Sequence, residues 1–403
     1  MRAHRLRAET FPVRWGYSLT SPGEKREARP SLSHRAWAEI SLDHLRHNAA
    51  ELQRLLPSGC RLMAVVKANA YGHGITEIAG HLNRSGMDSF AVAEIGEGIL
   101  LRERGIQGEI LILGYTDPER AADLARYHLT QTMVSLEYGQ ALEALGIDLE
   151  VHVKIDTGMN RLGVPHQDTE SILRCYDFVN LRVTGIFSHL SMSDGLGPEE
   201  TEFTRRQIAH FDGVVAQIKE AGIDPGLVHL QSSYGMLNYP ELRYDRARPG
   251  IALYGLLSQE GDAVRCQAEL RPVLALKATV TQVKEVQAGQ PVGYGRRFVP
   301  ERDIRIATVS IGYADGVPRM LSDGGGQVLI RGQRASIIGS ICMDQLTVDV
   351  TGIDGVMLGD TVTLIGQDGD EQITAGEIAA RCHTVTNEIV SRIGSRVQRI
   401  YVE

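Results

Sequence analysis

The chain has few aromatic residues, few cysteines and no long apolar run. Aromatic residues make up 5% of its 403 residues. No apolar run reaches the roughly 18 residues that a membrane-spanning helix needs, so we expect neither a membrane helix nor a membrane partner. The five cysteines are scattered and form no CxxC pair. This usage is typical of free thiols in a reducing compartment, and it predicts a cytoplasmic protein.

The chain as a whole also has no excess of positive charge. The formal net charge is −8, which argues against a nucleic-acid partner held through phosphate contacts. Residues 1–35 differ from the rest, because eight Lys or Arg against three Asp or Glu give them a net +5 and leave −13 on residues 36–403. Arg, Glu, Pro and Gly interrupt this stretch, so it lacks the unbroken apolar core of a secretory signal. We interpret residues 1–35 as a flexible basic leader outside the fold.

The first large part of the chain alternates short apolar runs with helix-like segments. Most of the runs are almost continuously apolar, as strands covered on both faces should be. In the segment 201–222 between two of them, Phe211, Val214 and Ile218 recur at helical spacing. The runs span residues 61–67, 89–94, 109–115, 131–136, 150–158, 182–190, 226–233 and 246–255. Eight such units predict that residues 36–271 form a (β/α)8 TIM barrel. A doubly wound open sheet is the alternative.

The pattern changes after Arg271, which indicates a second domain. A chain of 403 residues exceeds what one core usually covers. Residues 274–283 alternate apolar and polar side chains, and further strand-like runs follow, separated by turn signals. Only residues 374–393 have a helical pattern. We therefore expect residues 272–403 to form a mainly β C-terminal domain.

The strongest local motif is AVVKANAYGHG, residues 64–74. Lys67 ends an apolar strand, where a free ammonium is costly unless it is paired or used covalently. An isolated lysine at a strand end normally extends to solvent. Here the position is the C-terminal mouth of the first barrel strand, where barrel enzymes place their chemistry. A lysine there can form an imine with a pyridoxal phosphate (PLP) cofactor or directly with a carbonyl substrate, and the fold alone does not distinguish the two.

The motif AVVKANAYGHG resembles the PLP-lysine signature of the alanine racemase family. The resemblance extends from about Ala36 to the C-terminus through several further motifs. It implies a PLP-dependent racemase that interconverts L- and D-alanine, supplies D-alanine for peptidoglycan and acts as a homodimer with shared active sites. The remaining assignments follow from this resemblance, residue by residue.

Several motifs match residues that bind the cofactor or the substrate in that family. In KIDTGMNRLG, the resemblance implies that Arg161 contacts the substrate carboxylate or the phenolic oxygen of the cofactor, and that Lys154 is carbamylated and paired with Arg161. Arg248 would face the pyridine nitrogen. The other implied cofactor-binding residues are Lys67 itself, Tyr71, His189 beside Arg248, Ser233, and the backbone amides of Gly250 and Ile251.

Racemisation needs one base on each face of a planar intermediate. Lys67 serves one face, and Tyr294 in the GYG motif matches the tyrosine base that the partner subunit contributes in this family. A tyrosine needs nearby positive charge to work as a base, which the pair His189 and Arg248 would supply. Tyr313 would line the entrance, and Met343 would contact the substrate through its backbone.

One position departs from the family pattern. Asn387 stands where alanine racemases carry a tyrosine that reaches the cofactor phosphate and narrows the pocket. Asparagine opens volume and leaves an amide able to bind a hydroxyl. The same change marks the serine/alanine racemase domains of vancomycin-resistance membrane proteins, which this chain resembles more closely, although their N-terminal membrane portion has no counterpart in this sequence. We therefore expect serine racemisation beside alanine racemisation, with neutral drift at a tolerant position as the alternative.

Two other functions share the barrel and Lys67. A non-catalytic PLP-handling protein would need neither the β domain nor Tyr294 and Met343. A fold-related PLP decarboxylase would place a carboxylate instead of Arg248 at the pyridine nitrogen and a cysteine near its C-terminal chemistry. Cys342, beside Met343, keeps the decarboxylase open at this stage. No metal site is expected.

Overall fold

The computed structural model describes residues 34–403. The predicted leader, residues 1–35, lies outside this part of the chain except for its last two residues, His34 and Arg35. Among residues 34–403, no helix is both long and apolar enough to cross a membrane.

Eight parallel strands form a barrel, as the sequence predicted. The first strand is divided at Met63 into two halves, of which one pairs with the last strand and the other with the second, so that the sheet closes. The strands in spatial order are β2(Arg61–Leu62) with β3(Ala64–Val65), β4(Ser89–Val92), β5(Glu109–Ile112), β6(Thr130–Met133), β7(Leu149–Asp156), β9(Leu181–Phe187), β10(Leu227–Ser232) and β11(Arg246–Arg248). A short β8(Val164–Pro165) pairs with β7 outside this order.

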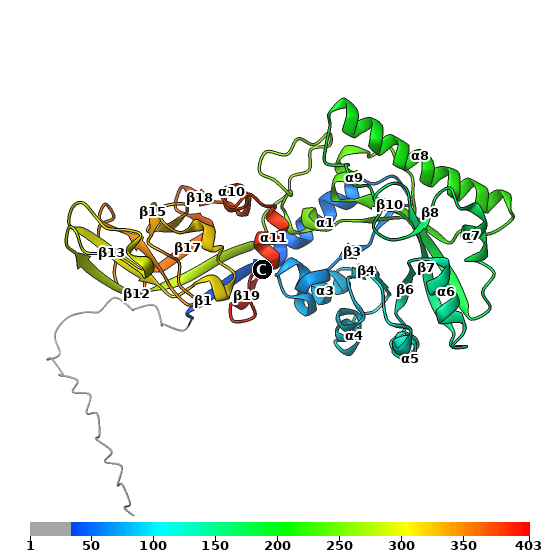
Figure 1. Ribbon diagram of the computed structural model, residues 1–403, viewed down its shortest axis with the longest axis horizontal. Helices are drawn as coiled ribbons and strands as arrows, with labels where there is room; N and C mark the ends of the chain where they lie inside the picture. Colours follow the sequence, from blue (N-terminus) through cyan, green and yellow to red (C-terminus); the bar gives the residue numbers. More distant parts are fainter. Residues whose placement is uncertain (1–33) are drawn as a thin grey trace, which may run out of the picture. The chain divides into compact units, whose positions relative to one another are not determined.

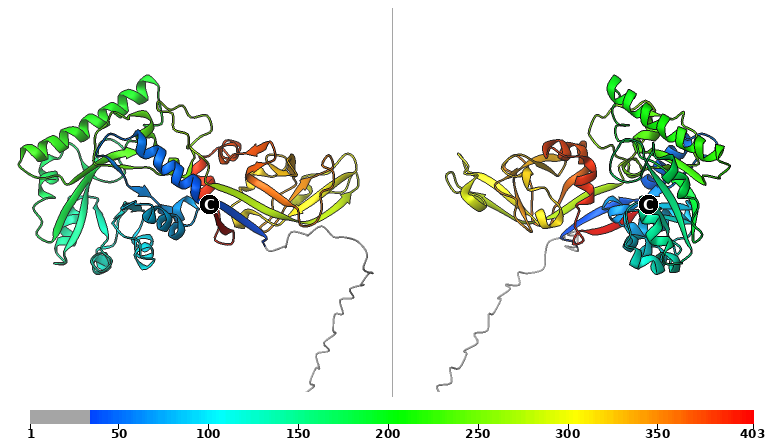
Figure 2. Two further views of the ribbon diagram at one scale, coloured as in Figure 1. Left: turned by 180° about the vertical axis from the view of Figure 1, so that it is seen from behind. Right: turned by 45° about the vertical axis from the view of Figure 1, so that its right-hand side comes forward.

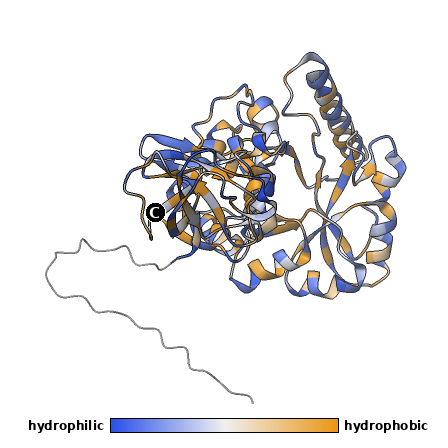
Figure 3. Cartoon of the chain, turned by 60° about the vertical axis from the view of Figure 1, so that its left-hand side comes forward, coloured by the Kyte–Doolittle hydropathy of each residue, from blue (hydrophilic) through white to orange (hydrophobic). Residues whose placement is uncertain are grey.

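Helices cover the outside of the barrel (Figure 1). They are α1(Leu42–Leu55), α3(Ile75–Arg84), α4(Ile95–Glu103), α5(Ala121–Arg126), α6(Leu136–Glu143), α7(Thr169–Arg174), α8(Pro198–Glu220) and α9(Ser233–Asn238). The longest, α8, begins with Pro198 at its first turn followed by two glutamates, which suit a helix N-terminus. Phe211, Val214 and Ile218 are buried on one face, so α8 carries apolar and polar residues on different sides (Figure 3). Each such buried side chain contributes about 1.5–3 kcal/mol of hydrophobic stabilisation.

The second sheet is mainly antiparallel. Six of its strands pair in a ring, because β17 pairs with both β14 and β12. In spatial order the strands are β18(Glu371–Ile373), β17(Thr361–Asp368), β14(Gln327–Ile330), β15(Gln333–Ile338), β16(Leu346–Asp349), β13(Ile304–Val309), β12(Leu274–Val286), β1(Ala36–Ser41) and β19(Gln398–Val402). Helices α10(Ala375–Arg381) and α11(Thr386–Ser391) occupy the segment predicted to be helical. A mainly β second domain is therefore confirmed.

One strand of the second sheet comes from the start of the chain. β1 pairs with β12 in antiparallel fashion and with β19 in parallel fashion, and Figure 2 shows β1 beside β12. Residues 36–41 were expected in the barrel segment, but their pairing assigns them to the second sheet. The alternation of buried and half-buried residues in β1 predicts a strand and does not say which sheet receives it.

The C-terminal segment is anchored to the mouth of the barrel. Arg399 donates hydrogen bonds to the carbonyls of Gly72 and Ile393, at 3.0 and 2.7 Å. Gly72 has φ +83°, and an added Cβ would lie 2.0 Å from the Val390 carbonyl oxygen. Only glycine fits this contact, which brings α11 next to the segment that follows Lys67.

Candidate functional site

A cavity of about 450 Å³ opens at the C-terminal ends of the barrel strands. Four basic residues line it, whereas one of its described lining residues, Asp194, is acidic. The site residues predicted from the sequence that line it are Lys67, Tyr71, Lys154, Arg161, His189, Ser233, Arg248, Gly250, Ile251 and Asn387. A cavity with this balance of charge suits a ligand that carries phosphate or carboxylate groups.

Lys67 begins a turn of unusual handedness. Residues 68–71 all have φ between 50° and 54°, so the backbone forms a left-handed helical turn. For residues other than glycine this conformation costs roughly 1–2 kcal/mol each. Glu97 offsets part of this cost, since one carboxylate oxygen accepts from Ala68 N at 2.6 Å and the other from Ala93 N at 2.8 Å. The turn holds Lys67 and Tyr71 at the same cavity.

The environment of Lys67 makes its amine available as a nucleophile and a base. Burial and the nearby charge of Arg161 lower the pKa of the Lys67 ammonium, with Glu97 acting in the opposite direction. A lowered pKa raises the fraction of free amine at neutral pH.

Ser233, Gly250 and Tyr71 form a cradle for an anion. The Ser233 hydroxyl accepts hydrogen bonds from Gly250 N at 3.0 Å and from Ala252 N at 3.2 Å. A Cβ on Gly250 would lie 2.5 Å from the Tyr71 hydroxyl, so the backbone approaches closely only because no side chain is present. Burial raises the pKa of Tyr71 to about 12, so its hydroxyl stays protonated and can donate. This donor set fits a phosphate group.

Arg248 is held rigidly at the base of the cavity. It is 3% exposed and donates to His229 Nδ1 at 2.7 Å, to the Ser188 carbonyl at 2.7 Å and to the Leu230 carbonyl at 3.0 Å. Burial lowers its pKa to about 9, so the guanidinium remains charged at neutral pH. No carboxylate within residues 34–403 pairs with it.

His189 was expected beside Arg248, and both residues line the cavity. The hydrogen-bond partner of the guanidinium is another histidine, His229. Burial, with the charges of Lys154 and Arg248, lowers the pKa of His189 well below its usual value, which makes the ring neutral. His189 therefore contributes no positive charge to the site.

Lys154 is buried without an ion-pair partner among the described residues. It is 8% exposed, and its Nζ lies 4.3 Å from the centre of the Phe187 ring. Burial, followed by the charges of Arg248 and Arg161, lowers its pKa well below the usual value. Among the described residues it has no hydrogen-bond acceptor or ion-pair partner, which is costly for an ammonium.

Three predicted site residues lie outside this cavity. Tyr294, Met343 and Tyr313 are 73%, 52% and 42% exposed, respectively, and belong to neighbouring loops of the second domain. Tyr313 N donates to the Cys342 carbonyl at 3.0 Å, and the Ser340 hydroxyl contacts the Tyr294 carbonyl at 3.5 Å. Within one chain the cavity therefore lacks its expected second base.

Asn387 reaches the cavity from helix α11. Its side-chain Oδ1 is buried and has no hydrogen-bond partner within residues 34–403. An unpaired buried acceptor of this kind favours a ligand that brings a donor.

Sequence reasoning missed the residues that support the site. Glu97 holds the turn after Lys67, and His229, His152 and Glu109 lie behind Arg248. The last three are polar residues within apolar strands, which is the one signal that could have marked them. Their partners lie on other strands, so no local pattern shows the connection.

The family comparisons agree with this architecture. The family model described as "Alanine racemase, N-terminal domain" matches residues 40–258, and that described as "Alanine racemase, C-terminal domain" matches residues 273–401. An amino-acid racemase of Enterococcus faecalis is 44% identical over 95% of this chain and 54% of its own length. A serine/alanine racemase of Enterococcus gallinarum is 41% identical over 90% of this chain and 51% of its own. The chain thus spans about half the length of these relatives.

Other similar proteins match over nearly their whole length. An alanine racemase of Carboxydothermus hydrogenoformans is 43% identical over 91% of this chain and 99% of its own. The solved alanine racemase of Clostridium difficile 630 has a TM-score of 0.86 at 35% identity, covering 93% of this chain and 97% of that one. The structure of alanine racemase from Bartonella henselae with covalently bound pyridoxal phosphate has a TM-score of 0.80 at 30% identity, covering 92% and 100%.

Proposed function

The chain belongs to the alanine racemase family, and from this premise we propose that it is a PLP-dependent racemase that interconverts L- and D-alanine. The observation that carries the proposal is the single cavity shared by Lys67, the anion cradle at Ser233 and Gly250, and Arg248. The product would be D-alanine for peptidoglycan. The five thiols, all free, support a reducing cytoplasmic location.

The residues present fit pyridoxal phosphate at both ends. Ser233, Gly250, Ile251 and Tyr71 would hold the phosphate, and the Lys67 amine would attach to the aldehyde carbon. When bound, the cofactor supplies a ring that accepts the electron pair left when the bond from Cα to hydrogen breaks. Arg248 would donate to the ring nitrogen and would not readily give up its proton, which would limit the electron demand of the ring and disfavour side reactions.

Arg161 and Lys154 would receive the anionic groups beside the ring. Arg161 lines the cavity and can hold the substrate carboxylate or the phenolic oxygen of the cofactor. Lys154 is proposed to be carbamylated, because its lowered pKa favours the neutral amine, which would add to carbon dioxide and release one proton to solvent, leaving a carbamate anion near Arg161 and Arg248.

The second base is proposed to come from a second copy of the chain. Lys67 removes or returns a proton on one face of Cα, and Tyr294 on the other. Since Tyr294 is 73% exposed and does not line the cavity of its own chain, a homodimer with shared sites would complete it. Tyr313 and Met343, on adjoining loops, would enter the partner's cavity with it.

Serine is proposed as a second substrate. Asn387 lines the cavity, its Oδ1 has no hydrogen-bond partner among the described residues, and its side-chain amide could bind a substrate hydroxyl. The resemblance to serine/alanine racemase supports the same choice.

The two rival functions are less well supported by the site. A decarboxylase would be expected to present a carboxylate at the ring nitrogen, and Arg248 has none beside it among the described residues. A non-catalytic PLP-handling protein does not need the second domain that the chain carries.

Exchange with solvent tests the proposal directly. Incubation of the purified protein and PLP with L-alanine in deuterium oxide should give D-alanine and deuterium at Cα of both enantiomers. Carbon dioxide release would indicate decarboxylation, and protein that retains PLP without exchanging Cα hydrogen would indicate a handling role. Either result would overturn the racemase assignment.

A further inference from the structure

Four side chains form a line of close polar contacts through the barrel interior behind the cavity. Arg248 Nη1 donates to His229 Nδ1 at 2.7 Å, and His229 Nε2 lies 2.9 Å from His152 Nδ1. His152 Nε2 in turn lies 2.9 Å from Glu109 Oε1. The four residues come from β11, β10, β7 and β5, and both imidazole rings are fully buried.

Hydrogen-bond chemistry gives this line one direction. An arginine has donors and no acceptor, so His229 Nδ1 must accept and its proton must lie on Nε2. His229 then donates to His152 Nδ1, which leaves the proton of His152 on Nε2, facing Glu109. This last contact is an ion-pair approach rather than an aligned hydrogen bond. Glu109 also accepts from the Ser89 hydroxyl at 2.8 Å.

The charges at the two ends agree with this assignment. Burial acts to raise the pKa of Glu109, but the contacts with His152 and Ser89 outweigh it, so the carboxylate stays ionised at neutral pH. Burial and the charge of Arg248 lower the pKa of His229 well below its usual value, so this ring is neutral. The line of contacts thus runs from the cation Arg248 to the anion Glu109.

The surrounding residues leave room for the rings and hold them in place. A Cβ on Gly185 of β9 would lie 2.6 Å from His152 Nε2, so the ring occupies space that any side chain would fill. Phe187 stacks on His229, with 4.8 Å between ring centres and 6° between planes. Neither ring can rotate freely in such a site.

We propose that Glu109, acting through His152 and His229, is a positioning residue that fixes the orientation in which Arg248 faces the ring nitrogen of bound pyridoxal phosphate. Three of the five N–H groups of Arg248 are used by His229, Ser188 and Leu230, which leaves two for the ligand. If the proton of His229 lay on Nδ1 instead of Nε2, the ring would present an N–H to the guanidinium, and Arg248 would have to move. The inference rests on the proposed function for the identity of the ligand. The line of contacts from Glu109 through His152 and His229 to Arg248, which we call the relay, belongs to the protein alone.

Three variants separate the effects of the Glu109 hydrogen-bond acceptor, the Glu109 charge and the space around the His152 ring. Glu109→Gln keeps an oxygen that His152 can approach and removes the charge, whereas Glu109→Met removes both at similar volume. Gly185→Ala changes no polar group and displaces the His152 ring. Glu150→Gln is the matched control, because Glu150 lies on the same strand as His152 but forms an exposed pair with Arg182.

The primary readout is the state of the imidazole rings in ¹⁵N-histidine-labelled holoenzyme, measured by long-range ¹H–¹⁵N correlation. In the wild type, we expect the rings of His152 and His229 to be protonated on Nε2 alone. Glu109→Gln and Glu150→Gln should give the same signals for these two rings, whereas Glu109→Met and Gly185→Ala should alter them. With alanine as substrate, Glu109→Met and Gly185→Ala should lower kcat by about tenfold with little change in KM. Glu109→Gln should retain most of the wild-type kcat.

The outcomes distinguish the relay from the proposed function. Unchanged ring signals in Glu109→Met and Gly185→Ala, or changed signals with an unchanged kcat, would overturn the relay as a positioning device. If Glu109→Met does not fold, the comparison of Glu109→Gln with Gly185→Ala decides in the same way. A wild-type protein that shows the two Nε2–H rings but binds no PLP would overturn the proposed function and leave the ring assignment intact.

Discussion

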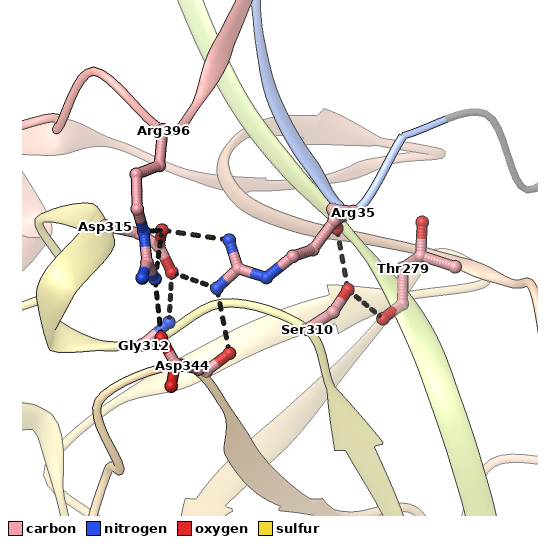
Figure 4. Close-up of polar contacts among 7 residues, drawn as sticks. All are labelled: Arg35, Thr279, Ser310, Gly312, Asp315, Asp344 and Arg396. Atoms are coloured by element: carbon pink, nitrogen blue, oxygen red, sulfur yellow. Dashed lines mark hydrogen bonds and ion pairs between the residues drawn. The ribbon is translucent and has the colours of Figure 1, made fainter.

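Arg35 and Asp315, 280 positions apart in the sequence, form a two-point ion pair with N–O distances of 2.9 and 2.5 Å (Figure 4). Asp315 is fully buried and also accepts from Arg396 and from Gly312 N. Arg396 continues to Asp344, the residue after Met343. The cluster therefore joins the start of β1 to the two loops that carry Tyr313 and Met343.

Asp315→Asn should lower the free energy of unfolding by about 2 kcal/mol at neutral pH, because it removes the charge that three groups satisfy. Burial acts to raise the pKa of Asp315, but Arg35, Gly312 and Arg396 outweigh it, so the folded-state pKa is lowered. A lowered pKa adds stability above the unfolded value of about 4 and loses it as the pH falls through the folded value. The difference between wild type and variant should therefore shrink below about pH 4.

Denaturant unfolding at pH 7 and at acid pH measures this difference. The control is Asp344→Asn, which removes an exposed pair and should cost less than about 1 kcal/mol. A difference between Asp315→Asn and wild type that stays constant with pH would contradict the assignment of the charge.

Mixing Lys67→Ala chains with Tyr294→Phe chains should restore activity that neither homodimer has. Each mixed dimer would hold one intact site, made of Lys67 from one chain and Tyr294 from the other. Random pairing predicts recovery of about a quarter of the wild-type rate. A mixture of Lys67→Ala chains with chains that carry both substitutions is the negative control. If the first mixture is as inactive as the second, the sites are not shared.

Asn387→Tyr should lower the ratio of kcat/KM for serine to that for alanine by about tenfold, since a ring would fill the space that a hydroxymethyl group needs and remove the amide acceptor. Asn387→Ala keeps the space and lacks the amide, so it separates the two causes. A ratio that is the same in all three proteins would mean that Asn387 does not select the substrate.

Lys154 should take up carbon dioxide. Holoenzyme equilibrated with ¹³C-bicarbonate should show one protein-bound carbamate carbon by NMR, because the amine is buried, has a lowered pKa and has no ion-pair partner among the described residues. Lys154→Met should lose the signal and much of the activity, whereas Lys219→Met, on the outer helix α8, should keep both. A wild-type spectrum without a carbamate signal would rule out the modification.

Local pattern was sufficient for much of the fold and for part of the site. The eight apolar runs, the change after Arg271 and the helical segment near the C-terminus all correspond to observed elements. Lys67 was marked by its place at the end of an apolar run, whereas Ser233 and Arg248 were assigned from the resemblance of their motifs to the alanine racemase family, and all three line one cavity. The hydrogen bond between Arg248 and His229 was not predicted, since His229 lies on another strand and only the tertiary structure brings the two side chains together.

The sequence by itself determined the succession of strands and helices, the position of Lys67 at a strand end and the chemistry that its neighbours can perform, because these depend on residue type and short-range periodicity. Only the tertiary structure decided that β1 joins the second sheet, that Glu97 holds the left-handed turn, that Glu109 lies behind Arg248 and that Tyr294 lies outside its own cavity. Each of these depends on contacts between residues far apart in the chain. Periodicity shows that a face is buried, but it does not name the residues that cover it.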